Sequence, residues 1–112
     1  MSDPDLFEVV ISESAEADLR AIAAYLEGQA GPAVAVKFTD SILERVAALE
    51  HMPLRGSLPK ELEGINRKGY RQLVQGNYRI FYTVVGRRVQ IALIADGRRD
   101  MEALLTARLL AP

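Results

Sequence analysis

Residues 70–100 read YRQLVQGNYRIFYTVVGRRVQIALIADGRRD, and this stretch decides the fold. It holds runs rich in Val, Ile and Tyr, which are separated first by Gly76 and Asn77 and then by Gly86 and Arg87. Apolar runs joined by two-residue turns of this kind are typical of β-hairpins. The stretch therefore predicts a three-stranded antiparallel meander.

The register of the meander follows if both turns have two residues, because directly opposed positions share a face. One face is then continuous and apolar, and it holds Leu73, Ile80, Tyr82, Val84, Val89, Ile91 and Leu93. The opposite face is half apolar, and it holds Gln72, Val74, Arg79, Phe81, Thr83, Gln90, Ala92 and Ile94. Since a fully solvated face is more polar than this, we expect the C-terminal segment or a partner to cover it.

The segment before the meander predicts one strand and two helices. Residues 7–12 alternate weakly, as a strand does, and Ser12 or Ser14 can then cap a helix with its side-chain oxygen. We predict Gly28 as the C-cap of this helix and Pro32 as the start of the second one. Both helices carry apolar residues at every third or fourth position, so they predict an αα-hairpin that covers the apolar face of the meander.

The remaining segments complete the topology. Residues 53–68 predict a loop with one helical turn near residues 60–62, and Asp100 is the predicted N-cap of a last helix over residues 101–110. The fold class is α+β, in the order β-α-α-β-β-β-α, with the antiparallel meander packed against the αα-hairpin. The length of 112 residues predicts a single domain over residues 1–112.

The composition argues against several classes of site. The chain has no cysteine, which excludes disulfides and thiolate metal ligands, and its one histidine, His51, argues against zinc and His-based catalysis. We expect no metal and no cofactor. No apolar run is long enough for a membrane span, and residues 1–5 lack the features of a signal peptide, so we expect a cytoplasmic protein.

The charge is distributed unevenly along the chain. Residues 1–65 carry five basic and twelve acidic side chains, a net charge of −7, whereas residues 66–112 carry nine basic and three acidic ones, a net charge of +6. The sheet half could therefore meet nucleic acid or an acidic protein segment. The sequence pI near 5.8 argues against a dedicated nucleic-acid binder, so we expect no sequence-specific binding of nucleic acid.

The order and spacing of several short motifs resemble the RelE/ParE superfamily of bacterial toxins over about residues 7–110. The matching positions are Ala15, Asp18, Leu19, Ile22, Tyr25 and Leu26 in the first helix, Pro53 and Gly56 after the second, residues 76–82 in the meander, and residues 96–100. The Gly-Arg-Arg-Asp ending is similar to the ParE branch, in which a histidine often precedes the glycine; Asp96 stands there in this sequence.

The resemblance implies two mechanisms. ParE-like members inhibit DNA gyrase as binding proteins without chemistry of their own, whereas RelE-like members are ribosome-dependent endoribonucleases that cut messenger RNA. In both branches a cognate antitoxin, here ParD-like, binds the toxin and silences it. For the ribonuclease alternative, Arg71, Arg79 and Arg99 would carry the charge stabilisation, with Arg79 and Arg99 matching the arginines of the family.

Proton transfer decides between the two mechanisms. Cleavage of RNA needs a base and an acid beside the arginines. The resemblance implies that RelE-like enzymes also use lysines on the first meander strand and a tyrosine in the C-terminal segment. In this sequence the lysine positions fall on Tyr70 and Gln72, and the tyrosine position falls on the apolar pair Leu104 and Leu105. We therefore favour a gyrase inhibitor that is not an enzyme.

The candidates for binding the target or the antitoxin lie on the second face of the meander and at its end. They are Val74, Arg79, Phe81, Ile94, Arg98 and Arg99. A structural role competes with this interpretation. Phe81, Ile94 and Val74 could pack under the last helix, and Arg79 and Arg99 could pair with Asp96 or Asp100.

Overall fold

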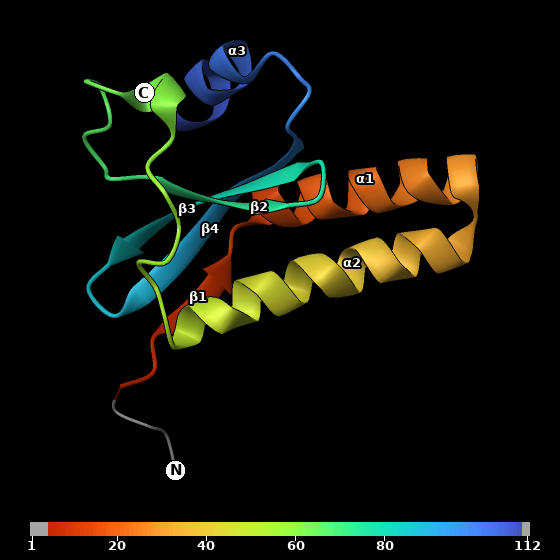
Figure 1. The fold of residues 1–112 in the computed structure, drawn as a ribbon, viewed down its shortest axis with the longest axis horizontal. Helices are drawn as coiled ribbons and strands as arrows, with labels where there is room; N and C mark the ends of the chain where they lie inside the picture. The colour runs from red at the N-terminus through yellow and green to blue at the C-terminus, as the bar shows by residue number, and fades with distance from the viewer. Residues whose placement is uncertain (1–4, 111–112) are drawn as a thin grey trace.

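A computed structural model describes residues 5–110, so the signal-peptide prediction for residues 1–5 falls almost entirely outside the described residues. A four-stranded sheet lies between a helical hairpin on one face and the C-terminal helix on the other (Figure 1). The elements are β1 Glu8–Ile11, α1 Glu13–Ala30, α2 Pro32–Ala47, η1 Ala48–Glu50, η2 Lys60–Leu62, β2 Arg71–Gln75, β3 Tyr78–Val85, β4 Arg88–Asp96, α3 Met101–Leu105 and the π-helical turn η3 Thr106–Leu110. The predicted α+β class and element order are confirmed.

The helical hairpin begins and turns at capped positions. The Ser12 hydroxyl oxygen accepts a hydrogen bond from the Ala15 amide at 3.1 Å and caps α1. The prediction that Gly28 ends this helix is wrong, because α1 continues to Ala30 and Gly31 ends it with φ 93°. Only glycine adopts this conformation without strain, and the following Pro32 starts α2 at a position where no amide hydrogen is needed.

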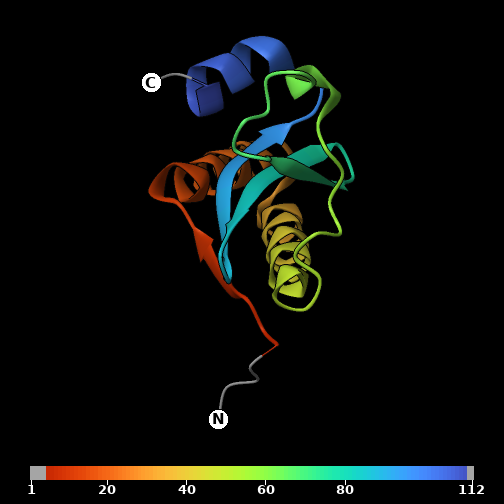
Figure 2. The ribbon, with the colours of Figure 1, turned by 90° about the vertical axis from the view of Figure 1, so that its left-hand side faces the viewer.

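The sheet has the order β1-β4-β3-β2. β2, β3 and β4 form the predicted antiparallel meander, while β1 pairs with β4 in parallel, a pairing that the sequence analysis did not predict. Figure 2 shows β1 at one edge of the sheet, and the loop after η1 passes beyond the opposite edge, next to β2. In that loop Ser57 exchanges backbone hydrogen bonds with Gln72 of β2, at 3.0 and 2.8 Å.

A β-bulge changes the predicted register near the end of β4. Tyr82 pairs with Ile91 as predicted, but Phe81 pairs with Leu93, so Ala92 is an additional residue in β4. The predicted faces of Leu93 and Ile94 are therefore wrong. Beyond the bulge, Ile94 lies on the face of the helical hairpin and Leu93 lies under the C-terminal helix.

Two apolar clusters occupy the two faces of the sheet. The cluster under the helical hairpin holds Ala15, Phe38, Ile42, Val46, Leu49, Leu73, Ile80, Tyr82, Val89, Ile91 and Ile94. The cluster on the other face holds Leu62, Tyr70, Phe81, Leu93, Ala95, Met101, Leu105 and Leu109. The chain's own C-terminal segment, together with η2, therefore covers the second face of the meander, which is one of the two alternatives left open by the sequence.

No helix within the described residues has both the length and the apolar character that a membrane crossing needs.

Candidate functional site

Arg79 is the arginine of β3 that matches the strand arginine of the RelE-like enzymes, and its side chain contacts Glu61, Gln72 and Phe81. Its Nη1 and Nη2 donate hydrogen bonds to the two carboxylate oxygens of Glu61 at 2.7 and 2.8 Å, and its Nε donates to Gln72 Oε1 at 2.6 Å. The guanidinium carbon lies 4.9 Å from the centre of the Phe81 ring. Because the side chains of Arg79 and Glu61 are only 14% and 11% exposed, this is a nearly buried, bidentate ion pair.

The ion pair fixes the protonation of Glu61. The hydrogen bond from Arg79 is the largest cause that lowers the pKa of Glu61 from 4.5 to about 2, against the opposing effect of burial. Glu61 is therefore ionised at neutral pH and is a weak proton acceptor. The pair attaches η2 to the sheet, and the predicted alternative partners of Arg79, Asp96 and Asp100, have other roles.

Asp96 and Asp100 shape the turn into the last helix. Asp96 accepts hydrogen bonds from Arg98 Nε and Nη2 at 3.0 and 2.6 Å, and these bonds lower the pKa of Asp96 to about 2. Asp100 caps α3 by accepting from the Ala103 amide at 3.1 Å, as predicted. Arg99 is exposed, and within the part of the chain that the structure describes no hydrogen bond or ion pair engages its side chain.

Arg71, the third arginine of the ribonuclease alternative, also has a structural role. Its Nη1 donates to the carbonyl oxygens of Leu54 and Gly56 at 3.3 and 2.8 Å. Gly56 is enclosed as well, since a Cβ there would lie 2.6 Å from the Tyr82 hydroxyl oxygen, which accepts a hydrogen bond from the Gly56 amide. Arg71 and Arg79 thus both hold the loop of residues 51–69 against the sheet.

The apolar candidates divide between core and surface. Phe81 and Ile94 are both buried, one in each apolar cluster. Phe81 packs under the C-terminal helix, as the competing account has it, whereas Ile94 packs under the helical hairpin. The predicted face of Ile94 is wrong, because the bulge turns it toward the helical hairpin, whereas Phe81 lies on the predicted face and the C-terminal segment covers it. Val74 is more than half exposed on β2, and the binding role of Val74, Arg98 and Arg99 stays a prediction.

A second ion pair, between Asp18 and Arg108, was missed by the sequence analysis. The two side chains form two hydrogen bonds of 2.9 Å and join α1 to η3, and the hydrogen bond to Asp18 raises the pKa of Arg108. Asp18 also accepts from the Ile94 amide at 3.1 Å, and Arg108 donates to the Ala92 carbonyl at 3.3 Å. The pair therefore satisfies one backbone group of the bulged residue Ala92 and one of Ile94, two residues further on.

An open groove of about 310 Å³ lies between the helical hairpin and the β2–β3 turn. Its lining is apolar apart from a few polar groups, and consists of Leu26, Val34, Lys37, Phe38, Ser41, Gln75, Gly76, Asn77 and Tyr78. Tyr78 and Phe38 both line the groove, and their ring centres lie 4.7 Å apart. Such apolar grooves with a few polar groups are the usual form of a binding site.

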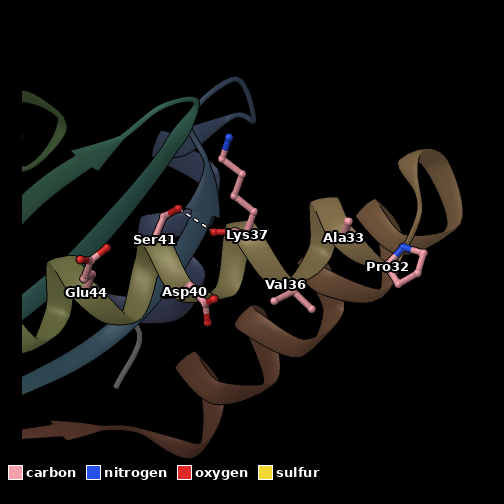
Figure 3. A pocket seen from close by; sticks show the side chains of 7 residues that line it. All are labelled: Pro32, Ala33, Val36, Lys37, Asp40, Ser41 and Glu44. Carbon is pink, nitrogen blue, oxygen red and sulfur yellow. Dashed lines mark hydrogen bonds between the residues drawn. The ribbon is translucent and has the colours of Figure 1, made fainter.

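A second, more open hollow of about 630 Å³ follows the outer surface of α2 and meets the groove at Lys37 and Ser41. Figure 3 shows its lining side chains along this one helix, with the Ser41 hydroxyl donating to the Lys37 carbonyl at 2.7 Å. Lys37 extends away from Val36 and Asp40, so it stands at the border of the two hollows (Figure 3). A partner segment in the groove can therefore reach a cationic group at its rim.

The described residues contain no group of three or more His, Asp or Glu side chains that could hold a metal ion. The groups described above can bind a protein segment through apolar contact and charge. Glu61, the carboxylate in contact with the strand arginine, has its pKa lowered to about 2.

The fold is shared with chains of toxin–antitoxin complexes. A chain of the chromosomal ParDE toxin–antitoxin system from P. aeruginosa has a TM-score of 0.69 and 24% sequence identity, and the match covers 82% of this chain and 97% of that one. A chain of the toxin–antitoxin complex RelBE2 from Mycobacterium tuberculosis has a TM-score of 0.54 and 20% identity, with 86% of this chain and 97% of that one covered. At these identities the likeness shows the fold alone.

The sequence itself matches a family described as the ParE toxin of the type II toxin–antitoxin system parDE, over residues 9–101. This match spans most of the chain, so the protein belongs to the ParE toxin family. None of the curated proteins matches the sequence. The predicted resemblance to the RelE/ParE superfamily, and to its ParE branch, is confirmed.

Proposed function

We propose that this protein is a toxin that inhibits DNA gyrase by protein–protein contact in the cytoplasm, and that a ParD-like antitoxin neutralises it. Membership of the ParE toxin family supports the class. The engagement of Arg79 by Glu61 is the observation that carries the mechanism, because it argues against the alternative of RNA cleavage.

An endoribonuclease needs a base, an acid and positive charge that is free to meet the phosphate in the transition state. The charge of Arg79 is already neutralised by Glu61, and Arg71 donates to backbone carbonyls. Burial raises the pKa of Tyr70, which occupies one of the family's lysine positions, so its proton is harder to remove. Leu105, at the family's C-terminal tyrosine position, is buried in the second apolar cluster.

The groove at the tip of the helical hairpin is the surface that we propose for the antitoxin. Its apolar lining fits one side of an amphipathic segment, and Lys37 at the rim favours a carboxylate on that segment. Arg98 and Arg99 lie at the end of β4, whose last residue Asp96 pairs with Tyr78 of the groove, so they can add positive charge for an acidic segment.

A matched pair of variants tests the antitoxin surface. Val34→Glu places a carboxylate in the groove, and Val85→Glu places one at the far β3–β4 hairpin, where the side chain is exposed. We expect Val34→Glu to weaken copurification with the antitoxin by at least about tenfold, and Val85→Glu to leave it unchanged. Equal binding by both variants would remove the groove from the proposal.

Gyrase inhibition is tested with purified toxin, gyrase and relaxed plasmid. We expect the toxin to reduce supercoiling and to build up cleaved DNA, and equimolar antitoxin to restore supercoiling. Full supercoiling activity in the presence of excess toxin would refute gyrase as the target. Cleavage of messenger RNA on translating ribosomes would restore the endoribonuclease alternative.

A further inference from the structure

The loop that follows η1 exposes three large apolar side chains within seven residues. Met52, Leu54 and Leu58 are 59%, 60% and 61% exposed. Together with the exposed Arg55 between them, we call them the 52–58 patch. Single exposed apolar side chains are ordinary, but a group of three in one short loop indicates a surface for another molecule.

The loop that carries the patch is fixed to the sheet. Ser57 exchanges two backbone hydrogen bonds with Gln72, and the Arg55 amide donates to the Met52 carbonyl at 3.2 Å. From beneath, Arg71 donates to the carbonyls of Leu54 and Gly56, as described above. A partner that binds the patch therefore orders little additional backbone, which lowers the entropic cost of binding.

The charge of this loop differs from that of the segments around it. Residues 51–60 carry Arg55, Lys60 and His51 and no acidic residue, although they lie in the half of the chain with a net charge of −7. Within the described residues no ion pair engages Arg55. The patch is thus apolar and cationic, and it is complementary to an apolar protein segment that carries carboxylates.

The 52–58 patch is separate from the groove proposed for the antitoxin. The groove lies along the first half of α2, from Val34 to Ser41, whereas the patch follows the C-terminal end of that helix. In Figure 2 the loop runs along the β2 side of the sheet, opposite β1. The groove and the patch therefore lie near opposite ends of α2.

We propose that the 52–58 patch binds the toxin's target, through an apolar segment of the target protein that carries carboxylates. This inference rests on the proposed function in one respect, namely that the toxin acts by protein contact rather than by RNA cleavage. It does not require the target to be gyrase.

The test compares two double variants with matched exposure. Leu54→Ser/Leu58→Ser removes apolar surface from the patch, and Val36→Ser/Val85→Ser removes it from the outer side of α2 and the far hairpin, where the side chains are 58% and 60% exposed. Growth arrest on expression, inhibition of gyrase, binding of the antitoxin and the melting temperature are measured for the wild type and both variants.

A charge variant complements the double variants. Arg55→Glu reverses the charge of the patch, and Arg20→Glu reverses an exposed charge on α1 as its control. We expect both patch variants to lose growth arrest and to inhibit the target at least about tenfold less, with unchanged antitoxin binding and melting temperature. Both control variants should behave as the wild type.

The outcomes separate this inference from the proposed function. If the wild type arrests growth without inhibiting gyrase, gyrase is refuted, and loss of arrest in the patch variants still supports the patch. Patch variants that arrest growth as the wild type does would overturn the inference. Patch variants that lose antitoxin binding while they still inhibit the target would overturn it as well. A wild type that does not arrest growth overturns both proposals.

Discussion

Replacing Glu61 by glutamine would remove the charge that faces Arg79 while it keeps the shape of the side chain. The lowering of the pKa of Glu61 from 4.5 to about 2 corresponds to roughly 3 kcal/mol of interaction with the ionised form. Solvent reaches part of the pair and glutamine keeps one acceptor oxygen, so we expect Glu61→Gln to lose about 2 kcal/mol of unfolding free energy at pH 7. For a protein of this size the melting temperature would fall by about 8 °C.

The pH dependence of this loss has a definite sign. The pKa of Glu61 is lower in the folded state than in the unfolded state, so its contribution is complete above about pH 4.5 and is lost as the pH falls toward about 2. The difference between wild type and Glu61→Gln should therefore disappear across this window. Urea unfolding followed by far-UV circular dichroism, at a series of pH values from 7 to below 3, measures it.

Glu63 provides the matched control, because it follows in the same loop and is exposed. Glu63→Gln should change the unfolding free energy by less than about 0.5 kcal/mol at every pH. The reasoning fails if Glu61→Gln is as stable as the wild type at pH 7, or if its deficit persists unchanged at pH 2.

Three further predictions concern the loop, α1 and the C-terminal segment. Gly56→Ala should cost at least about 2 kcal/mol in urea unfolding, because the added Cβ would lie 2.6 Å from the buried Tyr82 hydroxyl oxygen. Gly28→Ala, in α1 with nothing within 4 Å of the added Cβ, should instead stabilise the protein by up to about 1 kcal/mol, and a loss there would contradict the helical assignment. Arg108→Met should leave Asp18 unpaired and lower stability by about 1–2 kcal/mol, with faster hydrogen exchange in residues 101–110; unchanged exchange would show that apolar packing alone holds this segment.

The local parts of the fold could be predicted from local signals. The turns at Gly76 and Gly86, the serine cap of α1 and the aspartate cap of α3 each depend on a few neighbouring residues. The exception was the C-terminal end of α1. Either Gly28 or Gly31 could have ended this helix, and only the backbone conformation of Gly31 in the folded protein shows that the helix ends there.

The candidate site could be predicted only in part, because its main contacts join residues far apart in the chain. Arg79 and Glu61 are 18 residues apart, and Asp18 and Arg108 are 90 apart. Neither pair has a sequence spacing that is typical of an ion pair. Several acidic residues in the sequence could have formed an ion pair with either arginine. Phe81 was correctly placed on the second face, but the sequence left open whether that face meets the C-terminal helix or a partner.

The amino-acid sequence by itself determined the meander, the helical hairpin and the family, because turn residues, caps and apolar periodicity act over a few positions. Tertiary structure alone decided that β1 pairs with β4 and that a bulge at Ala92 exchanges the faces of Leu93 and Ile94. Leu93, Ile94 and Ala95 are all apolar, so no alternation in the sequence marks the shift in register. Asp18 and Arg108 bind the backbone beside the bulge, and their meeting depends on how α1 and the C-terminal segment pack on the sheet.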